Sequence, residues 1–189
     1  LAQFLNFSIP ARLYAFIILN EPSHGGARIT YAQYLASSEQ FEEAFSELKY
    51  LKKHHSDLPR VWELDADLNI LIGNKDAAIL SAKKAIEINP ASYNAFHILV
   101  DLTKADPNII APLNLEAFVA GAENKKNPAN IRAKLNHALG LLFEHQEDYE
   151  YAFKHYEIAN TLSMEIHKEM GFLYNKDEIE QYTQSLKDV

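Results

Sequence analysis

The sequence predicts an all-α protein: a solenoid of antiparallel helix pairs that wind into a right-handed superhelix with a C-terminal capping helix. Two observations support this fold class. Valine and threonine are scarce, whereas alanine, leucine, glutamate and lysine, which favour helices over strands, fill most of the 189 residues. Apolar and small residues also recur at a spacing of about 34 residues, the length of one helix pair.

Several register columns carry this repeat. Each column is a set of positions that lie 34 residues apart, one in each successive copy. A large residue, a small one four later, another small one further on and a proline near the end form the pattern of the tetratricopeptide repeat. The columns are Arg28, Trp62 and Phe96; Tyr31, Asp65 and Leu99; Ala32, Ala66 and Val100; Ala44 and Ala78; and Leu51 and Ala85.

The register divides the chain, taken as a single domain, into successive units. A partial repeat over residues 1–24 precedes full copies at about 25–58 and 59–92. The copy at 93–126 is irregular, because Asp106-Pro107 interrupts its second helix and Pro112 begins another one. A last copy spans 133–166, and a helix over about 175–189 caps the solenoid.

The copy from Pro59 to Ser92 follows the pattern most closely. Ala66, Ala78 and Ala85 lack bulk, so its two helices can approach to about 8–10 Å. Gly73 allows the turn between them, and Asn89-Pro90 ends the second helix. A large side chain at position 78 should therefore overpack the pair.

The last repeat carries a family resemblance. Residues Arg132 to Leu162 read RAKLNHALGLLFEHQEDYEYAFKHYEIANTL, and here the chain resembles the repeat region of bacterial tetratricopeptide-repeat sulfotransferases, whose closing repeat also ends in Ala-Asn. The resemblance covers about residues 90–189. It implies architecture only, because the phosphate loop with which that family's catalytic domain begins has no counterpart in this sequence.

Composition and motifs argue against several function classes. With 18 basic against 26 acidic residues and a net charge of −8, the chain is a poor nucleic-acid partner. The longest apolar run, Leu13 to Leu19, is far below the roughly 20 residues that cross a bilayer. There is no cysteine, no glycine-rich phosphate loop and no catalytic motif. The eight histidines show no metal-binding spacing and are expected to be exposed or capping. We therefore expect no enzymatic activity, metal or cofactor.

Binding is the remaining function, and the sequence predicts a non-catalytic scaffold for a peptide or protein. In such repeats the first helix of each pair forms a concave groove. The carboxylate clamp of chaperone-binding relatives is not expected, because its positions hold Ile29, Gln33 and Leu64. The register places the following side chains in the groove: Gln33, Arg60, Glu63, Asp67, Asn94, His97, Asp101, Lys134 and His137.

Two alternatives stay open at this point. The chain could be the regulatory or acceptor-presenting arm of a larger sulfotransferase whose catalytic domain lies elsewhere. It could also self-associate through an N-terminal end that lacks its natural cover. We expect a cytoplasmic protein, with secretion left open because the chain begins at Leu1 rather than methionine. The apolar residues of that end are Phe4, Leu5, Phe7, Leu13, Tyr14, Phe16 and Ile17.

Overall fold

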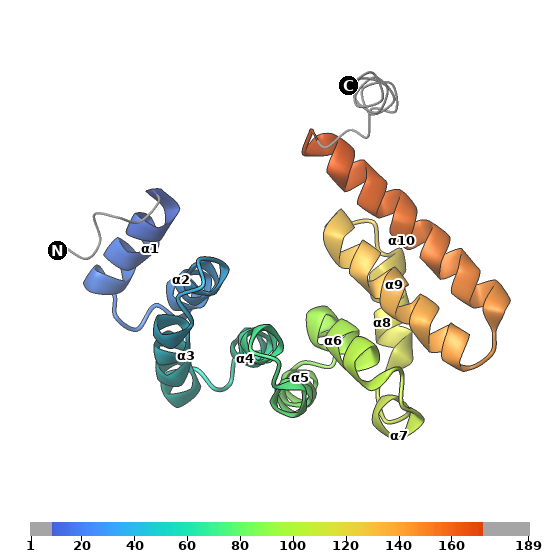
Figure 1. Ribbon diagram of the computed structural model, residues 1–189, viewed down its shortest axis with the longest axis horizontal. Coiled ribbons are helices and arrows are strands. Elements are labelled where there is room, and N and C mark those ends of the chain that lie inside the picture. The colour runs from blue at the N-terminus through green and yellow to red at the C-terminus, as the bar shows by residue number, and fades with distance from the viewer. Residues whose placement is uncertain (1–8, 172–189) are drawn as a thin grey trace, which may run out of the picture.

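A computed structural model describes residues 9–171 of the chain. This part contains ten helices and no strand, so the all-α prediction is confirmed for it. The helices follow a curved arc, with α2, α4 and α6 towards its inner side and α3 and α5 towards its outer side (Figure 1). Their bounds are α1 Ile9–Asn20, α2 Gly25–Ser37, α3 Phe41–His54, α4 Pro59–Leu71, α5 Lys75–Ile88, α6 Tyr93–Thr103, α7 Pro107–Ile110, α8 Leu115–Glu123, α9 Ala129–His145 and α10 Tyr149–Glu169.

Local sequence signals set the helix boundaries. Pro59 occupies the first turn of α4, where its missing N–H costs no hydrogen bond. The side chain of Asn74 caps α5 by accepting the N–H of Ala77 at 3.3 Å. The helix α5 ends at Ile88, directly before Asn89-Pro90. These boundaries agree with the signals in the sequence.

Three helix pairs turn in the same way. A residue with positive φ lies two positions after the end of the first helix of each pair: Glu39 at 61°, Gly73 at 77° and Glu147 at 60°. The residue after it donates its N–H to the carbonyl five positions earlier, which satisfies one of the free carbonyls at the helix end. These bonds run from Gln40 to Leu35 (2.8 Å), from Asn74 to Asn69 (2.8 Å) and from Asp148 to Phe143 (2.9 Å).

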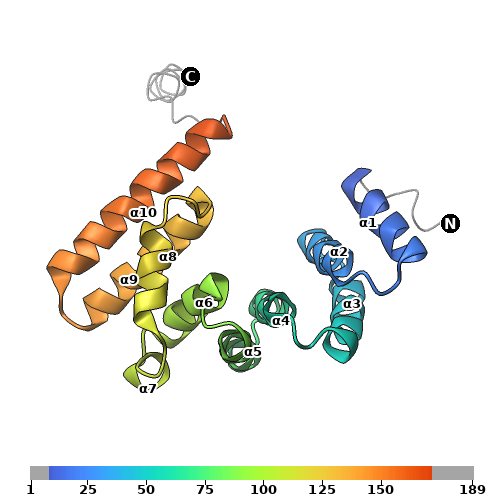
Figure 2. The same ribbon diagram turned by 180° about the vertical axis from the view of Figure 1, so that it is seen from behind.

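The third repeat departs from this scheme. Its second helix is split into α7, which has four residues, and α8, which has nine. Figure 2 shows α8 lying across α6 and α9, and both helices contact it. The ring of Phe118 on α8 stacks on Phe96 of α6 with centroids 3.9 Å apart. The sequence placed the start of α8 at Pro112, but the helix begins at Leu115 behind the capping residue Asn114.

The buried apolar residues form two clusters. The smaller one joins α2, α3 and α4 around Leu35, Leu51 and Leu64. The larger one extends from α4 to α9 and includes Phe96 and Phe118. The two clusters meet at α4, which contributes residues to both.

Some predictions fall on the parts of the chain outside the described range. The capping helix at about 175–189 lies outside it, as do the apolar residues Phe4, Leu5 and Phe7. Within the described range, α9 begins at Ala129, ahead of the expected start of the last repeat at residue 133. None of the described helices is both long enough and apolar enough to cross a membrane.

Candidate protein-binding groove

The side chains that the register predicts to line the groove occupy equivalent positions on successive first helices. On α4 these are Arg60, Glu63 and Asp67, which lie within two turns on one helical face. The same register positions on α6 hold a different set of side chains, with an amide and an imidazole in place of the cation and one carboxylate. That set is Asn94, His97 and Asp101.

Hydrogen bonds connect predicted groove residues on three of these helices. The side-chain amide of Asn94 donates to both carboxylate oxygens of Asp67, each at 3.5 Å. The ammonium of Lys134 on α9 donates to the side-chain oxygen of Asn94 at 3.2 Å. An acidic, a neutral and a basic side chain therefore form one row across α4, α6 and α9.

A second row consists of aromatic rings. The ring centroids of His97 and His137 lie 5.9 Å apart, and those of His137 and Tyr156 lie 5.8 Å apart. The hydroxyl of Tyr156 donates to the carboxylate of Glu144 at 2.6 Å. Gly140 gives Tyr156 its place, because a Cβ at position 140 would come within 2.6 Å of the tyrosine ring.

Burial shifts the pKa values of three predicted groove residues. It raises the pKa of Asp67 against the opposing effects of the Asn94 hydrogen bond and the charge of Lys134. It raises the pKa of Glu63 as well, and nearby Asp67 adds to the rise, whereas a hydrogen bond from Ser92 opposes it. The pKa of His97 falls to about 4, first because of burial and then because of Lys134 and His137, with Asp101 opposing. His97 is therefore neutral at physiological pH.

The predicted groove residues differ in how far they are buried and in the contacts that they make. Glu63, Asp67, Asn94, His97 and Asp101 are half-buried, whereas the other four are exposed. Gln33 on α2 has no hydrogen bond, ion pair or ring contact with the other groove residues within the described range. The four exposed residues are Gln33, Arg60, Lys134 and His137.

The register did not predict Tyr156 or Glu144 as part of this surface. Tyr156 lies on α10, a second helix, whereas the groove was predicted from first helices alone. The available signal was Gly140 inside α9, since a glycine within a helix often marks the close approach of another group.

The expectation that histidines are exposed or capping is wrong for His155. This side chain is buried, its Nδ1 lies 2.8 Å from the side-chain oxygen of Asn136, and its ring stacks on Phe143. Burial lowers the pKa of His155. The spacing of Ala152, His155 and Ala159, which places them on one helical face, was the signal that the sequence offered.

The groove does not assemble a metal site. In the range that the structure describes, no three histidine, aspartate or glutamate side chains come together as ligands. What the surface offers is a set of hydrogen-bond donors and acceptors of mixed charge beside three aromatic rings.

Comparison with known proteins bears on the fold. No protein-family model matches the chain, and no curated protein matches it in sequence. Solved structures do match it. One of them, a crystal structure of MamA, has 16% sequence identity and a TM-score of 0.53, and the match covers 87% of this chain and 99% of that chain. A crystal structure of the MamA protein, at 18% identity and a TM-score of 0.52, covers 84% and 83%. At these identities the likeness shows the fold alone, a helical solenoid of the tetratricopeptide type. The resemblance to sulfotransferase repeat regions is not shown.

Proposed function

We propose that the chain is a non-catalytic interaction module that binds a segment of a partner protein in its concave groove. The observation that supports this most is the row of Asp67, Asn94 and Lys134 across three helices. A solvated helix face would leave its carboxylates at their ordinary acidity, whereas burial raises the pKa of both Glu63 and Asp67. Polar groups held at such a cost are frequent at functional sites.

The groove favours a segment of mixed polarity. Its charged side chains are of both signs, with two cations among four carboxylates when Glu144 is included, so a strongly acidic ligand would gain little. Neutral His97 adds an imidazole that can donate or accept a hydrogen bond. A peptide backbone, which alternates donors and acceptors, matches these groups.

The experiment is a screen of displayed random peptides against the chain, followed by affinity measurements on the peptides that bind. The triple variant Arg60→Ala, Asp67→Ala, His97→Ala should weaken groove binders by about tenfold or more, because truncating central polar contacts commonly costs over 1 kcal/mol each. Circular dichroism checks that the variant is folded.

A matched triple variant on the outer side is the control for the effect of the groove variant on affinity. Lys83→Ala, Glu87→Ala, Asn108→Ala changes three residues beside another pocket, away from the groove, and should leave these affinities unaltered. If the groove variant retains all binding, the groove is not the site.

A second candidate is the regulatory or acceptor-presenting arm of a larger sulfotransferase. It is supported by the resemblance of Arg132–Leu162 to that family's closing repeat. The coding sequence beyond Val189 tests it directly. A phosphate loop between a strand and a helix would support the sulfotransferase arm, whereas a stop codon or further repeats would remove it.

A third candidate, within the same scaffold role, is self-association through α1. Leu13, Phe16 and Leu19 are 56%, 62% and 63% exposed, and they follow one another at three-residue spacing on α1. Light scattering over a range of concentrations tests it. An invariant monomer mass would eliminate this interface.

A further inference from the structure

Helix α4 presents different residues on its two sides. Arg60, Glu63 and Asp67 belong to the concave groove. A helix turns by about 100° per residue, so Trp62, Asp65 and Asn69 lie on the face roughly opposite to them. These three side chains line a pocket of about 640 Å³ between α3, α4 and α5.

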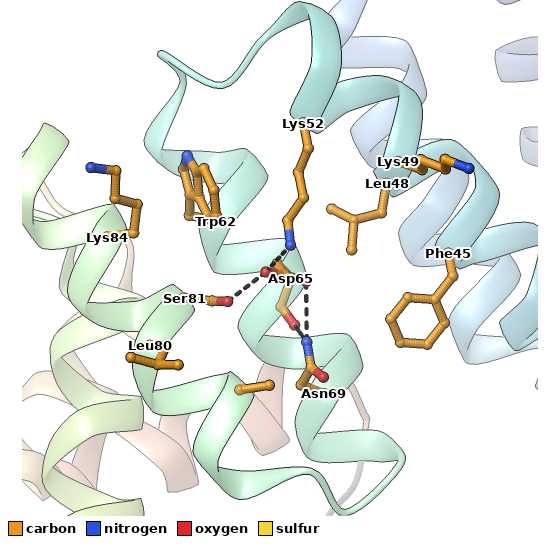
Figure 3. Close-up of a pocket in the computed structure, with 11 residues that line it drawn as sticks. Phe45, Leu48, Lys49, Lys52, Trp62, Asp65, Asn69, Leu80, Ser81 and Lys84 are labelled. Atoms are coloured by element: carbon orange, nitrogen blue, oxygen red, sulfur yellow. Dashed lines mark hydrogen bonds and ion pairs between the residues drawn. The ribbon is translucent and has the colours of Figure 1, made fainter.

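The floor of this pocket is polar and fully paired. Asp65 is only 4% exposed, and its carboxylate accepts hydrogen bonds from Ser81 and Asn69 and pairs with Lys52. The Lys52 ammonium also lies 5.1 Å from the centre of the Trp62 ring (Figure 3). These contacts connect all three helices, so the walls of the pocket are held in place before anything binds.

The two ends of the pocket differ in chemistry. Figure 3 shows Phe45 on α3 and Leu80 on α5, on opposite walls of the pocket, both in the lower half of the view, with Lys52, Trp62 and Lys84 in the upper half. Leu80 is 67% exposed although it is a large apolar side chain. One end therefore offers apolar surface, and the other offers positive charge.

The positive charge stands out against the rest of the chain. Three lysines and a single carboxylate line the pocket, although the net charge of the chain is −8. Lys49 makes no ion pair with any residue of the described range. Lys84 pairs with Glu87 at 2.8 Å, but both side chains are exposed, so a ligand can replace this weak contact.

We propose that this outer pocket docks a short segment of a partner protein that carries large apolar side chains and, about one helical turn away, carboxylates. The apolar side chains cover Phe45 and Leu80, and the carboxylates meet Lys49 and Lys84. Charge complementarity identifies the occupant as acidic. The apolar end favours a polypeptide over a nucleic acid, which would need cations along the whole surface. The site is independent of the concave groove.

The single tryptophan of the chain makes a site-specific probe, because Trp62 lies in the pocket. Three labelled peptides test the proposal: one with glutamates in its first turn and Leu and Phe in its second half, one with lysines in place of the glutamates, and one with alanines in place of Leu and Phe. The first should bind in fluorescence anisotropy and change the Trp62 emission. The other two should bind at least about tenfold more weakly, and added salt should weaken the first.

Variants locate the binding. Lys49→Glu, Lys84→Glu should weaken the acidic peptide by about tenfold or more, and Leu80→Ala by about fivefold. Neither change removes the Asp65 contacts, so both proteins should stay folded. The groove variant Arg60→Ala, Asp67→Ala, His97→Ala should bind the peptide as the unchanged chain does, which separates this test from that of the proposed function.

Each of several outcomes would overturn the proposal. These are no binding of the acidic peptide at millimolar concentration, equal binding of the lysine peptide, and equal binding by the Lys49→Glu, Lys84→Glu variant. Concentration-dependent association of the chain that this variant abolishes would instead assign the pocket to a second copy, and the proposal of a separate partner would fall.

Discussion

The second and third repeats use the same sequence register to build different structures. In the second, α4 and α5 form a regular antiparallel pair in which Ala78 and Ala85 are fully buried. In the third, the register positions of these alanines hold Pro112 and Val119, and the second helix is split into α7 and α8. Pro112 cannot continue a helix from the preceding turn, so the second helix of this repeat is interrupted at the position of Ala78.

The difference shows what a solenoid requires of each repeat. Neighbouring repeats need a complementary apolar surface and do not need identical helices. In the third repeat α8 supplies that surface by stacking Phe118 on Phe96 and burying Ala122 in the same cluster. The helices of the regular repeat pack through small residues, whereas those of the irregular repeat pack through the large ring of Phe118.

Removing that ring should have the largest effect. Phe118 is fully buried, so Phe118→Ala should lower the free energy of unfolding by about 4 kcal/mol through lost burial and a residual cavity. Urea denaturation measures it. Lys84 occupies the same register position in the second repeat and is exposed, so Lys84→Ala should change stability by less than about 0.5 kcal/mol. Similar losses for the two variants would contradict the contrast between the repeats.

Overpacking the regular repeat should have the second-largest effect on stability. Ala78→Leu places three more carbon atoms between α4 and α5 and should cost about 2 kcal/mol. Thermal unfolding followed by circular dichroism measures it. At the equivalent position of the third repeat, Pro112→Ala should cost less than about 1 kcal/mol, because Pro112 is exposed between α7 and α8. A tolerated leucine at position 78 would mean that small residues do not set the distance between the helices.

The equivalent groove positions Glu63 and His97 should respond to pH with opposite signs. The pKa of His97 is about 4 in the folded chain and about 6.5 when unfolded, so the unfolded state binds more protons as pH falls between these values. His97 should therefore lower stability by about 1–2 kcal/mol between pH 7 and pH 5, relative to His97→Gln. The pKa of Glu63 is raised, so its contribution is present at low pH and is lost as pH rises through the folded value.

Chemical denaturation at several pH values distinguishes the two positions. The variant His97→Gln should flatten the loss of stability towards pH 5, whereas Glu63→Gln should gain stability relative to the unchanged chain near pH 7. An unchanged pH profile for His97→Gln would show that the imidazole is not held neutral by burial.

The turns should give the smallest effects. Gly73 lies in the turn after α4 with φ of 77°, so Gly73→Ala should lower stability by about 1 kcal/mol. In the third repeat Lys104 has φ of 53° and carries an exposed side chain, so Lys104→Gly should raise stability by about 0.5–1 kcal/mol. Melting temperatures of the two variants should move in opposite directions. A rise for Gly73→Ala would contradict the role of glycine in this turn.

The sequence predicted the fold well where each signal is local. Proline at the start of α4, Gly73 at its end and Asn89-Pro90 after α5 all act within a few residues. The sequence also indicated that the third repeat is irregular. It did not predict that α8 would lie across α6 and α9, because this placement depends on contacts between residues far apart in the chain, such as Phe96 and Phe118.

The sequence could predict which helix faces form the groove, but not every side chain that contributes to it. The 34-residue register indicates which side chains lie on the inner side of first helices, and the structure links Asp67, Asn94 and Lys134 there. The register carries no information on side chains that reach in from a second helix, as Tyr156 does. The outer pocket was missed for the same reason, since it is assembled from α3, α4 and α5 together.

The division of the apolar residues into two clusters predicts which part of the chain unfolds locally first. The smaller cluster, over α2, α3 and α4, has fewer buried partners to lose than the larger one. Backbone amides around Leu48 and Leu51 should therefore exchange with deuterium at a lower opening free energy than those around Leu135 and Leu139. Because α4 belongs to both clusters, its amides should exchange with the slower group, and the arc should loosen from its N-terminal side.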